Sequence, residues 1–178
     1  MYNSVNVHSF TKVHGNKNRK RIIINYQEDI SADSAYIFSL LCPSERYKWI
    51  PGWSCEMIYS DSGKAEENAI FSEMISGLFL FGDSDGKTTW YTSQRNDQEK
   101  KTTYIIMFDT HIAGRIDTSC IHDGGSSCTY KWVYSLTALT DKGESLMDDG
   151  IEEKAHNVIS FIALCLKHFA ETGTTIPA

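Results

Sequence analysis

The stretch that decides the fold is the C-terminal sequence DKGESLMDDGIEEKAHNVISFIALCLKHFAET, residues 141–172. Its apolar residues recur three or four positions apart, which predicts a helix of about thirty residues and about 45 Å with one apolar stripe. Asp141-Lys-Gly-Glu144 is typical of a capping box, and Gly173 and Pro177 end the helix. The stripe consists of Met147, Ile151, Ala155, Val158, Ile159, Ile162, Leu166 and Phe169. A helix of this length needs a large apolar surface to cover.

Upstream of residue 141, residues 21–27 are rich in β-branched side chains, and from Trp53 onward apolar and polar residues alternate; both patterns are typical of strands. Trp53, Cys55, Met57 and Tyr59 alternate with a more polar set directly after Pro51-Gly52. Short turns separate most of the alternating runs, which predicts antiparallel pairing. The predicted strands are residues 21–27, 53–60, 69–75, 88–95, 102–110, 115–122 and 128–137.

Two short helices are expected between the first and second strands. Ser31 or Asp33 caps the first and Pro43 ends it, and residues 44–51 form a second short helix or turn. This order predicts an α+β fold, in which a curved seven-stranded antiparallel sheet wraps around the long C-terminal helix and leaves a cavity. The chain of 178 residues is expected to form one domain over 1–178, with a core at about 20–172.

Trp49 and Trp53 bracket Ile-Pro-Gly, where the second short helix gives way to a strand. Each indole brings a large apolar area to the end of the sheet that the short helices plug. Two interpretations are open: both tryptophans seal the core, or one of them lines the mouth of the cavity.

Four segments carry a resemblance to a known family: Trp49-Ile-Pro-Gly-Trp53-Ser-Cys-Glu56, Tyr59–Glu67, Ala69–Phe71 and Ser135–Thr140. They resemble a polyketide cyclase-like group of bacterial proteins in the SRPBCC superfamily, which is also called START-like or birch-pollen-allergen-like. The resemblance covers roughly residues 20–172 and implies the helix-grip fold. The superfamily includes lipid carriers, hormone receptors, polyketide cyclases, ring-hydroxylase subunits and chaperone activators, so it implies a fold more narrowly than a function.

The leading expectation is a protein that binds, and in one version transports, a small hydrophobic or aromatic ligand or lipid in the internal cavity. An enzyme of polyketide cyclase or dehydratase type using the same cavity is the alternative, although no catalytic nucleophile motif is recognisable. A protein-interaction module of the chaperone-activator type is the second alternative.

Composition excludes several classes of partner. A net charge of −6 argues against nucleic acid, and the basic cluster of Lys17, Arg19, Lys20 and Arg21 is expected to be a solvated approach to the first strand. No stretch is apolar enough for a signal peptide or a stable membrane insertion. Five scattered cysteines fit free thiols and a cytoplasmic protein.

Aromatic residues on the inferred inner face of the sheet are the strongest indication of a ligand. The same residues are equally consistent with a plain core packed against the long helix. Arg115 is included because a guanidinium can anchor a carboxylate with two hydrogen bonds. The candidate ligand-binding residues are Trp53, Phe71, Phe79, Trp90, Tyr104, Ile106, Phe108, Arg115, Trp132 and Tyr134.

Weak candidates for acid–base catalysis are Asp109, His111 and Glu56, because imidazole and carboxyl groups can move protons. The register of the hairpin from 115 to 135 is open. A two-residue turn places Arg115 and Asp117 on the face of Trp132, and a three-residue turn places Ile116 and Cys120 there.

Two apolar segments have no obvious partner in the predicted sheet. Ser76–Asp83 lengthens a loop and contains Leu78-Phe-Leu-Phe81. This apolar run could form a lid that places Phe79 over the cavity, touch a membrane, pair with a partner, or form an extended strand. Tyr104–Phe108 is apolar on both faces, which indicates a homodimer if a second subunit covers the outer one. No metal or cofactor is expected, because no phosphate-loop, calcium-loop, di-iron or zinc spacing is complete.

Overall fold

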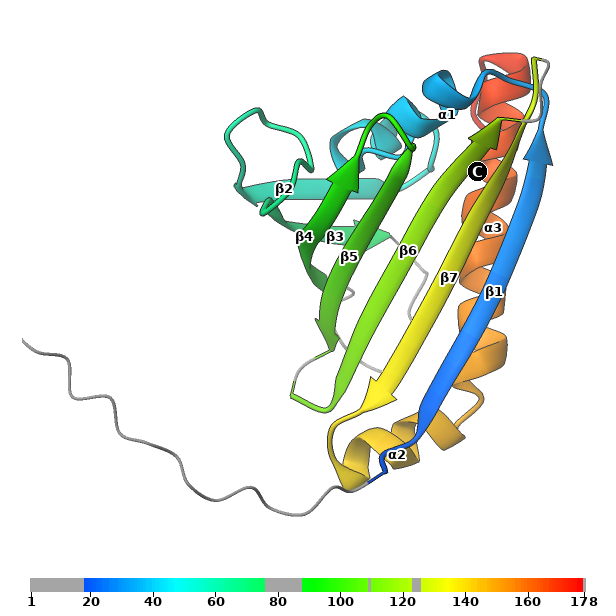
Figure 1. Ribbon diagram of the computed structural model, residues 1–178. Coiled ribbons are helices and arrows are strands. Elements are labelled where there is room, and N and C mark those ends of the chain that lie inside the picture. The colour runs from blue at the N-terminus through cyan, green and yellow to red at the C-terminus, as the bar shows by residue number, and fades with distance from the viewer. Residues whose placement is uncertain (1–17, 76–87, 109, 123–125, 178) are drawn as a thin grey trace, which may run out of the picture.

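The computed structural model describes residues 18–75, 88–108, 110–122 and 126–177. Its centre is a seven-stranded antiparallel sheet in the order β1-β7-β6-β5-β4-β3-β2, so the first strand lies beside the last (Figure 1). The expected meander of six strands is confirmed. The strands are β1 (Arg21–Ile30), β2 (Trp53–Tyr59), β3 (Ile70–Ile75), β4 (Thr88–Asn96), β5 (Lys101–Phe108), β6 (Ile112–His122) and β7 (Cys128–Ala138).

Two short helices follow β1 as expected: α1 (Ser34–Leu40) and the 3-10 helix η1 (Pro43–Lys48). Asp33 is the residue that caps α1, because its carboxylate accepts hydrogen bonds from the amides of Ala35 at 2.9 Å and Tyr36 at 3.1 Å. Pro43 opens η1, where its missing N–H costs no intrahelical hydrogen bond.

The C-terminal segment differs from the prediction of one long helix. It forms α2 (Asp141–Asp148) and α3 (Ile151–Thr172), separated at Gly150, which has a left-handed φ of 67°. The predicted capping box is also wrong, since the cap is Thr140, whose hydroxyl accepts from the amide of Gly143 at 3.1 Å. Acidic residues at 148 and 149 oppose the helix dipole at the end of α2, and glycine readily takes the left-handed turn that follows.

The register of the last hairpin decides which side chains face α3. Ile116 pairs with Tyr134 and Thr118 pairs with Trp132, so both β6 residues share the inner face with the β7 aromatics. Arg115 and Asp117 therefore lie on the outer face. This is the register that the longer turn predicts.

The helix α3 runs along the edge of the sheet formed by β1 rather than across its middle. Its backbone comes closest to β1 and α1, while the strands from β2 to β6 curve away from it (Figure 1). Large side chains project into the region between them and belong to one buried cluster with residues of α1, η1 and α3. The expected cavity in this region stays a prediction.

Trp49 and Trp53 both lie at the end of the sheet where the short helices pack. Each is buried, and each indole N–H donates to a backbone carbonyl of the short helices, Leu40 at 2.9 Å and Pro43 at 3.3 Å respectively. The core interpretation of both tryptophans agrees with these contacts. Within the described residues, no helix is long and apolar enough to cross a membrane.

Candidate functional site

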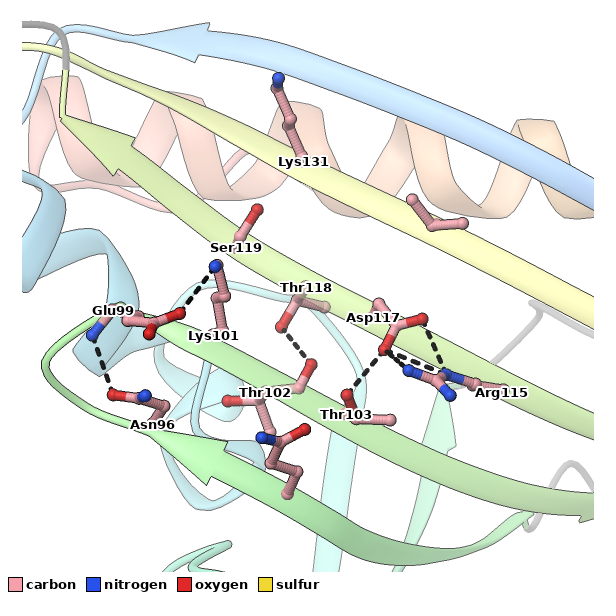
Figure 2. Close-up of a pocket in the computed structure, with 12 residues that line it drawn as sticks. Asn96, Glu99, Lys101, Thr102, Thr103, Arg115, Asp117, Thr118, Ser119 and Lys131 are labelled. Atoms are coloured by element: carbon pink, nitrogen blue, oxygen red, sulfur yellow. Dashed lines mark hydrogen bonds and ion pairs between the residues drawn. The ribbon is translucent and has the colours of Figure 1, made fainter.

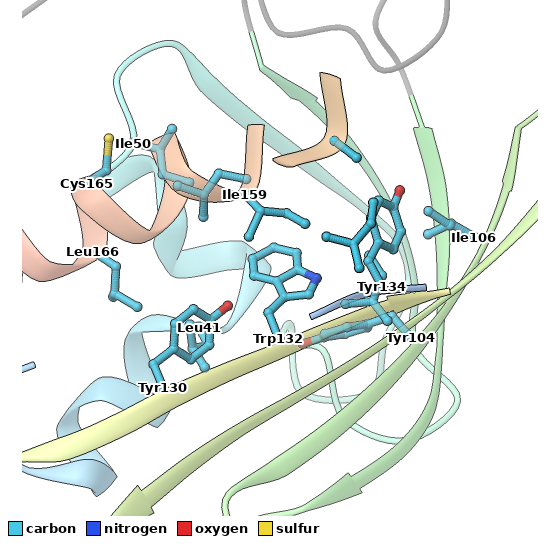
Figure 3. Close-up of a cluster of buried hydrophobic side chains, with 14 of the residues drawn as sticks. Leu41, Ile50, Tyr104, Ile106, Tyr130, Trp132, Tyr134, Ile159, Cys165 and Leu166 are labelled. Carbon is cyan, nitrogen blue, oxygen red and sulfur yellow. The ribbon is translucent and has the colours of Figure 1, made fainter. Parts of the chain in front are cut away.

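Aromatic side chains from four strands meet on the inner face of the sheet. Phe71 of β3 stacks on Trp90 of β4, with ring centroids 5.9 Å apart, and both meet the ring of Tyr104 edge-on at 5.8 Å. Figure 3 shows Trp132 of β7 at the centre of the neighbouring group, with Ile159 of α3 on its helix side. The inward alternation of apolar residues along β5 and β7 produces this arrangement.

Several polar atoms in the interior lack partners. Within the described residues, the buried side-chain atoms without a hydrogen-bond partner are Trp90 Nε1, Thr92 Oγ1, the Tyr130 hydroxyl and Trp132 Nε1. All four residues belong to β4 or β7. Each such group costs about 1–3 kcal/mol relative to a hydrogen-bonded one, so native proteins contain few of them. The interior thus offers donors that a polar group could satisfy.

A buried ion pair lies where η1 packs against β2 and β3. Arg46 Nη1 contacts both carboxylate oxygens of Glu73, at 3.1 and 3.3 Å, and the two side chains are 4% and 3% exposed. Arg46 Nε donates to the carbonyl of Leu41 at 3.1 Å. Its guanidinium also lies 5.1 Å from the centre of the Trp53 ring. The pair is therefore held from two elements and by an aromatic face.

Burial dominates the ionisation of this carboxyl. The loss of solvation raises the pKa of Glu73 from 4.5 to about 7, although the positive charge of Arg46 opposes the shift. Burial also raises the pKa of Tyr104 to about 12 and that of Cys55 to about 12, so both remain neutral near neutral pH. Glu73 is thus a group beside the aromatic cluster that can exchange a proton under physiological conditions.

The sequence predicts the position of one member of the Arg46–Glu73 pair but not that of the other. Glu73 follows Phe71 by two positions, so strand parity alone places its carboxyl on the inner face. Arg46 lies in a short helix without a hydrophobic period, and no pattern predicts that its side chain is buried. Neither residue was a candidate on sequence grounds.

Most of the candidate ligand-binding residues occupy the inner face. Trp90 and Phe108 are half-buried there, and the fully buried ones are Trp53, Phe71, Tyr104, Ile106, Trp132 and Tyr134. Their inward position makes a role in binding geometrically possible without testing it. Phe79 and Asp109 lie outside the described residues.

Two candidates are placed differently from the prediction. Glu56 and Arg115 are exposed on the outer face, so neither can orient a ligand in the interior. The reason is that successive side chains of a strand point to opposite faces, and each of these two residues lies an odd number of positions from the buried residues of its strand. Arg115 instead pairs with Asp117, where Nε lies 2.9 Å from Oδ2 and Nη2 lies 2.9 Å from Oδ1.

Arg115 and Asp117 border an open, polar depression of about 400 Å³ on the outer face (Figure 2). Thr103 donates to Asp117 at 2.6 Å, and Lys101 contacts Glu99 at 2.7 Å, so much of the charge is already paired. The charged side chains that line the depression are exposed or half-buried, which makes it a poor candidate for a specific site.

The contacts of His111 hold two elements of the fold together. Its Nδ1 lies 3.0 Å from the hydroxyl of Thr140, and its carbonyl accepts from the amide of Leu139 at 2.7 Å. These contacts attach the β5–β6 turn to the start of α2. Within the described residues, no group of three or more His, Cys, Asp or Glu side chains is arranged to hold a metal.

Comparison with known proteins identifies the fold. No protein-family model and no curated protein sequence matches the chain. Norcoclaurine synthase from Thalictrum flavum, solved as a point mutant with a transition-state analogue, matches with a TM-score of 0.68 at 10% identity, over 89% of this chain and 99% of that one. The same enzyme, solved with dopamine and hydroxybenzaldehyde, matches with a TM-score of 0.52 at 13% identity, over 84% and 98%.

Two further solved structures agree. Ara h 8.0201 matches with a TM-score of 0.65 at 9% identity, over 86% of this chain and 99% of that one. A START superfamily protein from Mycobacterium smegmatis matches with a TM-score of 0.61 at 11% identity, over 85% and 99%. The chain therefore has the START-like helix-grip fold, as the sequence resemblance implied. At these identities the likeness establishes the fold alone.

Proposed function

We propose that the protein binds a small aromatic or hydrophobic molecule in the interior between the sheet and α3. The observation that carries this proposal is the set of unpartnered polar atoms on β4 and β7, which includes Trp90 Nε1 and Trp132 Nε1. A guest with an aromatic body and an oxygen acceptor would satisfy these donors while it buries its rings among aromatic side chains.

Two observations support the proposal. The helix α3 lies along β1, so its backbone does not lie against the inner face of β3 to β5. Side chains of the buried cluster cover that face instead. Norcoclaurine synthase, which shares the fold, has been solved with the small aromatics dopamine and hydroxybenzaldehyde. Burial of ligand surface would supply affinity at about 25 cal/mol per Å² before association costs are subtracted.

A matched pair of variants tests the proposal with the neutral fluorophore 6-propionyl-2-(dimethylamino)naphthalene, whose ketone oxygen can accept a hydrogen bond. Trp132→Phe keeps an aromatic ring on the inner face but removes the indole N–H. We expect about a tenfold weaker Kd, because a hydrogen bond contributes about 1 kcal/mol and the smaller ring also packs less well. Fluorescence titration measures this change.

Tyr91→Phe is the control, since Tyr91 lies on the outer face and its hydroxyl contacts Asn68 at 2.6 Å. This variant should bind the fluorophore as the wild type does. Absence of saturable binding to the wild type would overturn the proposal, as would equal losses in the two variants.

An enzyme of the cyclase or dehydratase type is the second candidate, and Glu73 is the observation that favours it. A carboxyl with a pKa of about 7 can both accept and donate a proton at neutral pH. Such a site should accelerate deuterium exchange at the methyl group of 2-acetonaphthone, measured by NMR, and Glu73→Gln should abolish the acceleration. Exchange at the buffer rate in the wild type would exclude this candidate for aryl ketones.

Compartment and assembly follow as smaller parts of the proposal. All five cysteines are free thiols and four of them are buried, which supports the cytoplasm as a reducing location. The outer face of β5 exposes Met107 beside Tyr91, which supports a homodimer through this face. Sedimentation at micromolar concentration distinguishes the dimer from a monomer.

A further inference from the structure

Within the described residues, Arg46 is a buried cation whose ion-pair partner is a single carboxylate, that of Glu73. Its Nε donates to the carbonyl of Leu41 and its Nη1 donates to both carboxylate oxygens of Glu73. A guanidinium carries five N–H donors in a planar fork, and this shape matches carboxylates and other oxyanions. A buried guanidinium with one carboxylate counter-ion can therefore exchange it for another oxyanion of similar shape.

The groups around the pair are neutral or paired elsewhere. Glu73 is faced by Cys55 of β2, Tyr104 of β5 and Tyr134 of β7, whose pKa values are all raised by burial. Cys42 and Tyr130 also lie within electrostatic reach of Arg46. Arg95, which influences Tyr104, is paired with Asp97 at 2.7 Å. Within the described residues, Arg46 and Glu73 are thus the charged groups that set the local electrostatics.

The pair also borders the proposed ligand site directly. Glu73 follows Phe71 on the inner face of β3, and Arg46 lies against the ring of Trp53. The Tyr130 hydroxyl, which is buried and unpartnered, lies within the electrostatic influence of Arg46. An acidic group at Arg46 could accept a hydrogen bond from this hydroxyl while its aromatic body contacts Trp132, the ring next to Tyr130 at 6.0 Å.

We infer that the ligand is an aromatic or hydrophobic acid, whose anionic group replaces Glu73 as the counter-ion of Arg46 while Glu73 takes up one proton. This inference rests on the proposed binding function and names its ligand class. Two carboxylates at one buried guanidinium repel each other, so only one of them remains ionised. The proton comes from solvent and forms the neutral Glu73 carboxyl, and no covalent bond to the ligand is made.

The direction of the pH effect follows from the free protein. Glu73 is mostly protonated at pH 6 and mostly ionised at pH 8, because its pKa is about 7. Acid binding requires the protonated form, so the apparent Kd is the intrinsic Kd divided by the protonated fraction. An acid should therefore bind about tenfold more weakly at pH 8 than at pH 6, whereas a neutral analogue of the same shape should bind equally at both.

The test uses 2-naphthoate and its neutral isostere 2-naphthamide as competitors of bound 6-propionyl-2-(dimethylamino)naphthalene. The wild type should show the tenfold pH effect for naphthoate alone. Glu73→Gln should bind naphthoate with the same Kd at both pH values, close to the wild-type value at pH 6. Glu56→Gln removes a carboxylate from the outer face of β2 and should retain the full pH effect.

A measurement on the wild type alone tests the inference even if Glu73→Gln does not fold. Calorimetry in two buffers of different ionisation enthalpy should show uptake of about 0.9 proton per naphthoate at pH 8 and about none per naphthamide. If the fluorophore binds but naphthoate shows neither pH dependence nor proton uptake, the inference is wrong and the proposed function stands. If the fluorophore itself does not bind, both are overturned.

Discussion

At the scale of single residues, the Arg46–Glu73 pair shows how burial can outweigh charge attraction. Both side chains are almost completely removed from water, and the loss of solvation acts on each charge separately. The pKa of Glu73 is raised even though a guanidinium lies 3.1 Å away. Such a pair contributes little to stability when both groups are ionised, which makes a functional reason for its presence more compelling.

This balance predicts a pH-dependent difference in stability between the wild type and Glu73→Gln. A carboxyl whose pKa is raised in the folded state stabilises the protein fully below its unfolded pKa, near 4.5, and this contribution is lost as the pH rises through about 7. The wild type should therefore lose about 3 kcal/mol relative to the variant between pH 4.5 and pH 8. Urea unfolding of both proteins across this range measures the difference.

The comparison with the variant removes the contributions of other titrating groups, because these are the same in both proteins. A wild type that gains stability over Glu73→Gln as the pH rises would show that the ion pair is net favourable. The pKa of Glu73 would then be lowered, and the proton-coupled binding proposed for this site would lose its basis.

At the scale of elements, the junction between the sheet and the C-terminal helices depends on a close backbone approach. Gly143 lies in the first turn of α2, and a Cβ added there would come 2.2 Å from the carbonyl oxygen of His111. The same carbonyl accepts from the amide of Leu139, so it is fixed between β7 and the β5–β6 turn. Residue 143 must therefore be glycine because a side chain would clash with this carbonyl, and not because the backbone conformation favours glycine.

Gly143→Ala should lower the free energy of unfolding by on the order of 2 kcal/mol, because a backbone oxygen has little freedom to move away. The higher helix propensity of alanine opposes this loss by about 1 kcal/mol, so a net decrease reports the clash. Urea unfolding measures it.

Gly150→Ala is the matched control, since nothing lies within 4 Å of an added Cβ and only the φ of 67° is strained. Its cost should be about 1 kcal/mol. Equal losses in the two glycine variants would mean that α2 does not press against the β5–β6 turn.

The same junction shows what can be predicted about elements from the sequence. Sequence patterns located all seven strands, the first from its β-branched residues, and the Asp33 cap was one of two alternatives offered for α1. The break at Gly150 was missed because the apolar stripe continues in phase across it, from Met147 to Ile151 and Ala155. The Asp148-Asp149-Gly150 sequence was the available signal, since acidic residues and glycine favour a helix end.

At the scale of the whole molecule, the aromatic residues of the inner face could be predicted from the sequence. The polar and charged groups of the interior could be predicted only in part. Parity placed Tyr104, Trp132 and Tyr134 correctly, whereas Arg115 depended on a hairpin register that alternation alone does not fix. The burial of Arg46 arises only when η1 packs on β2 and β3. Contacts between elements distant in the chain leave no periodic trace in either segment.

The central claim is that the interior accommodates a guest which satisfies the donors of β4 and β7. A crystal structure of the purified protein, at a resolution that shows ordered solvent, tests this claim most directly. Density from an organic molecule or from ordered water should lie within hydrogen-bonding distance of Trp132 Nε1 and the Tyr130 hydroxyl. An interior filled by protein side chains, with both groups still unpartnered, would contradict it.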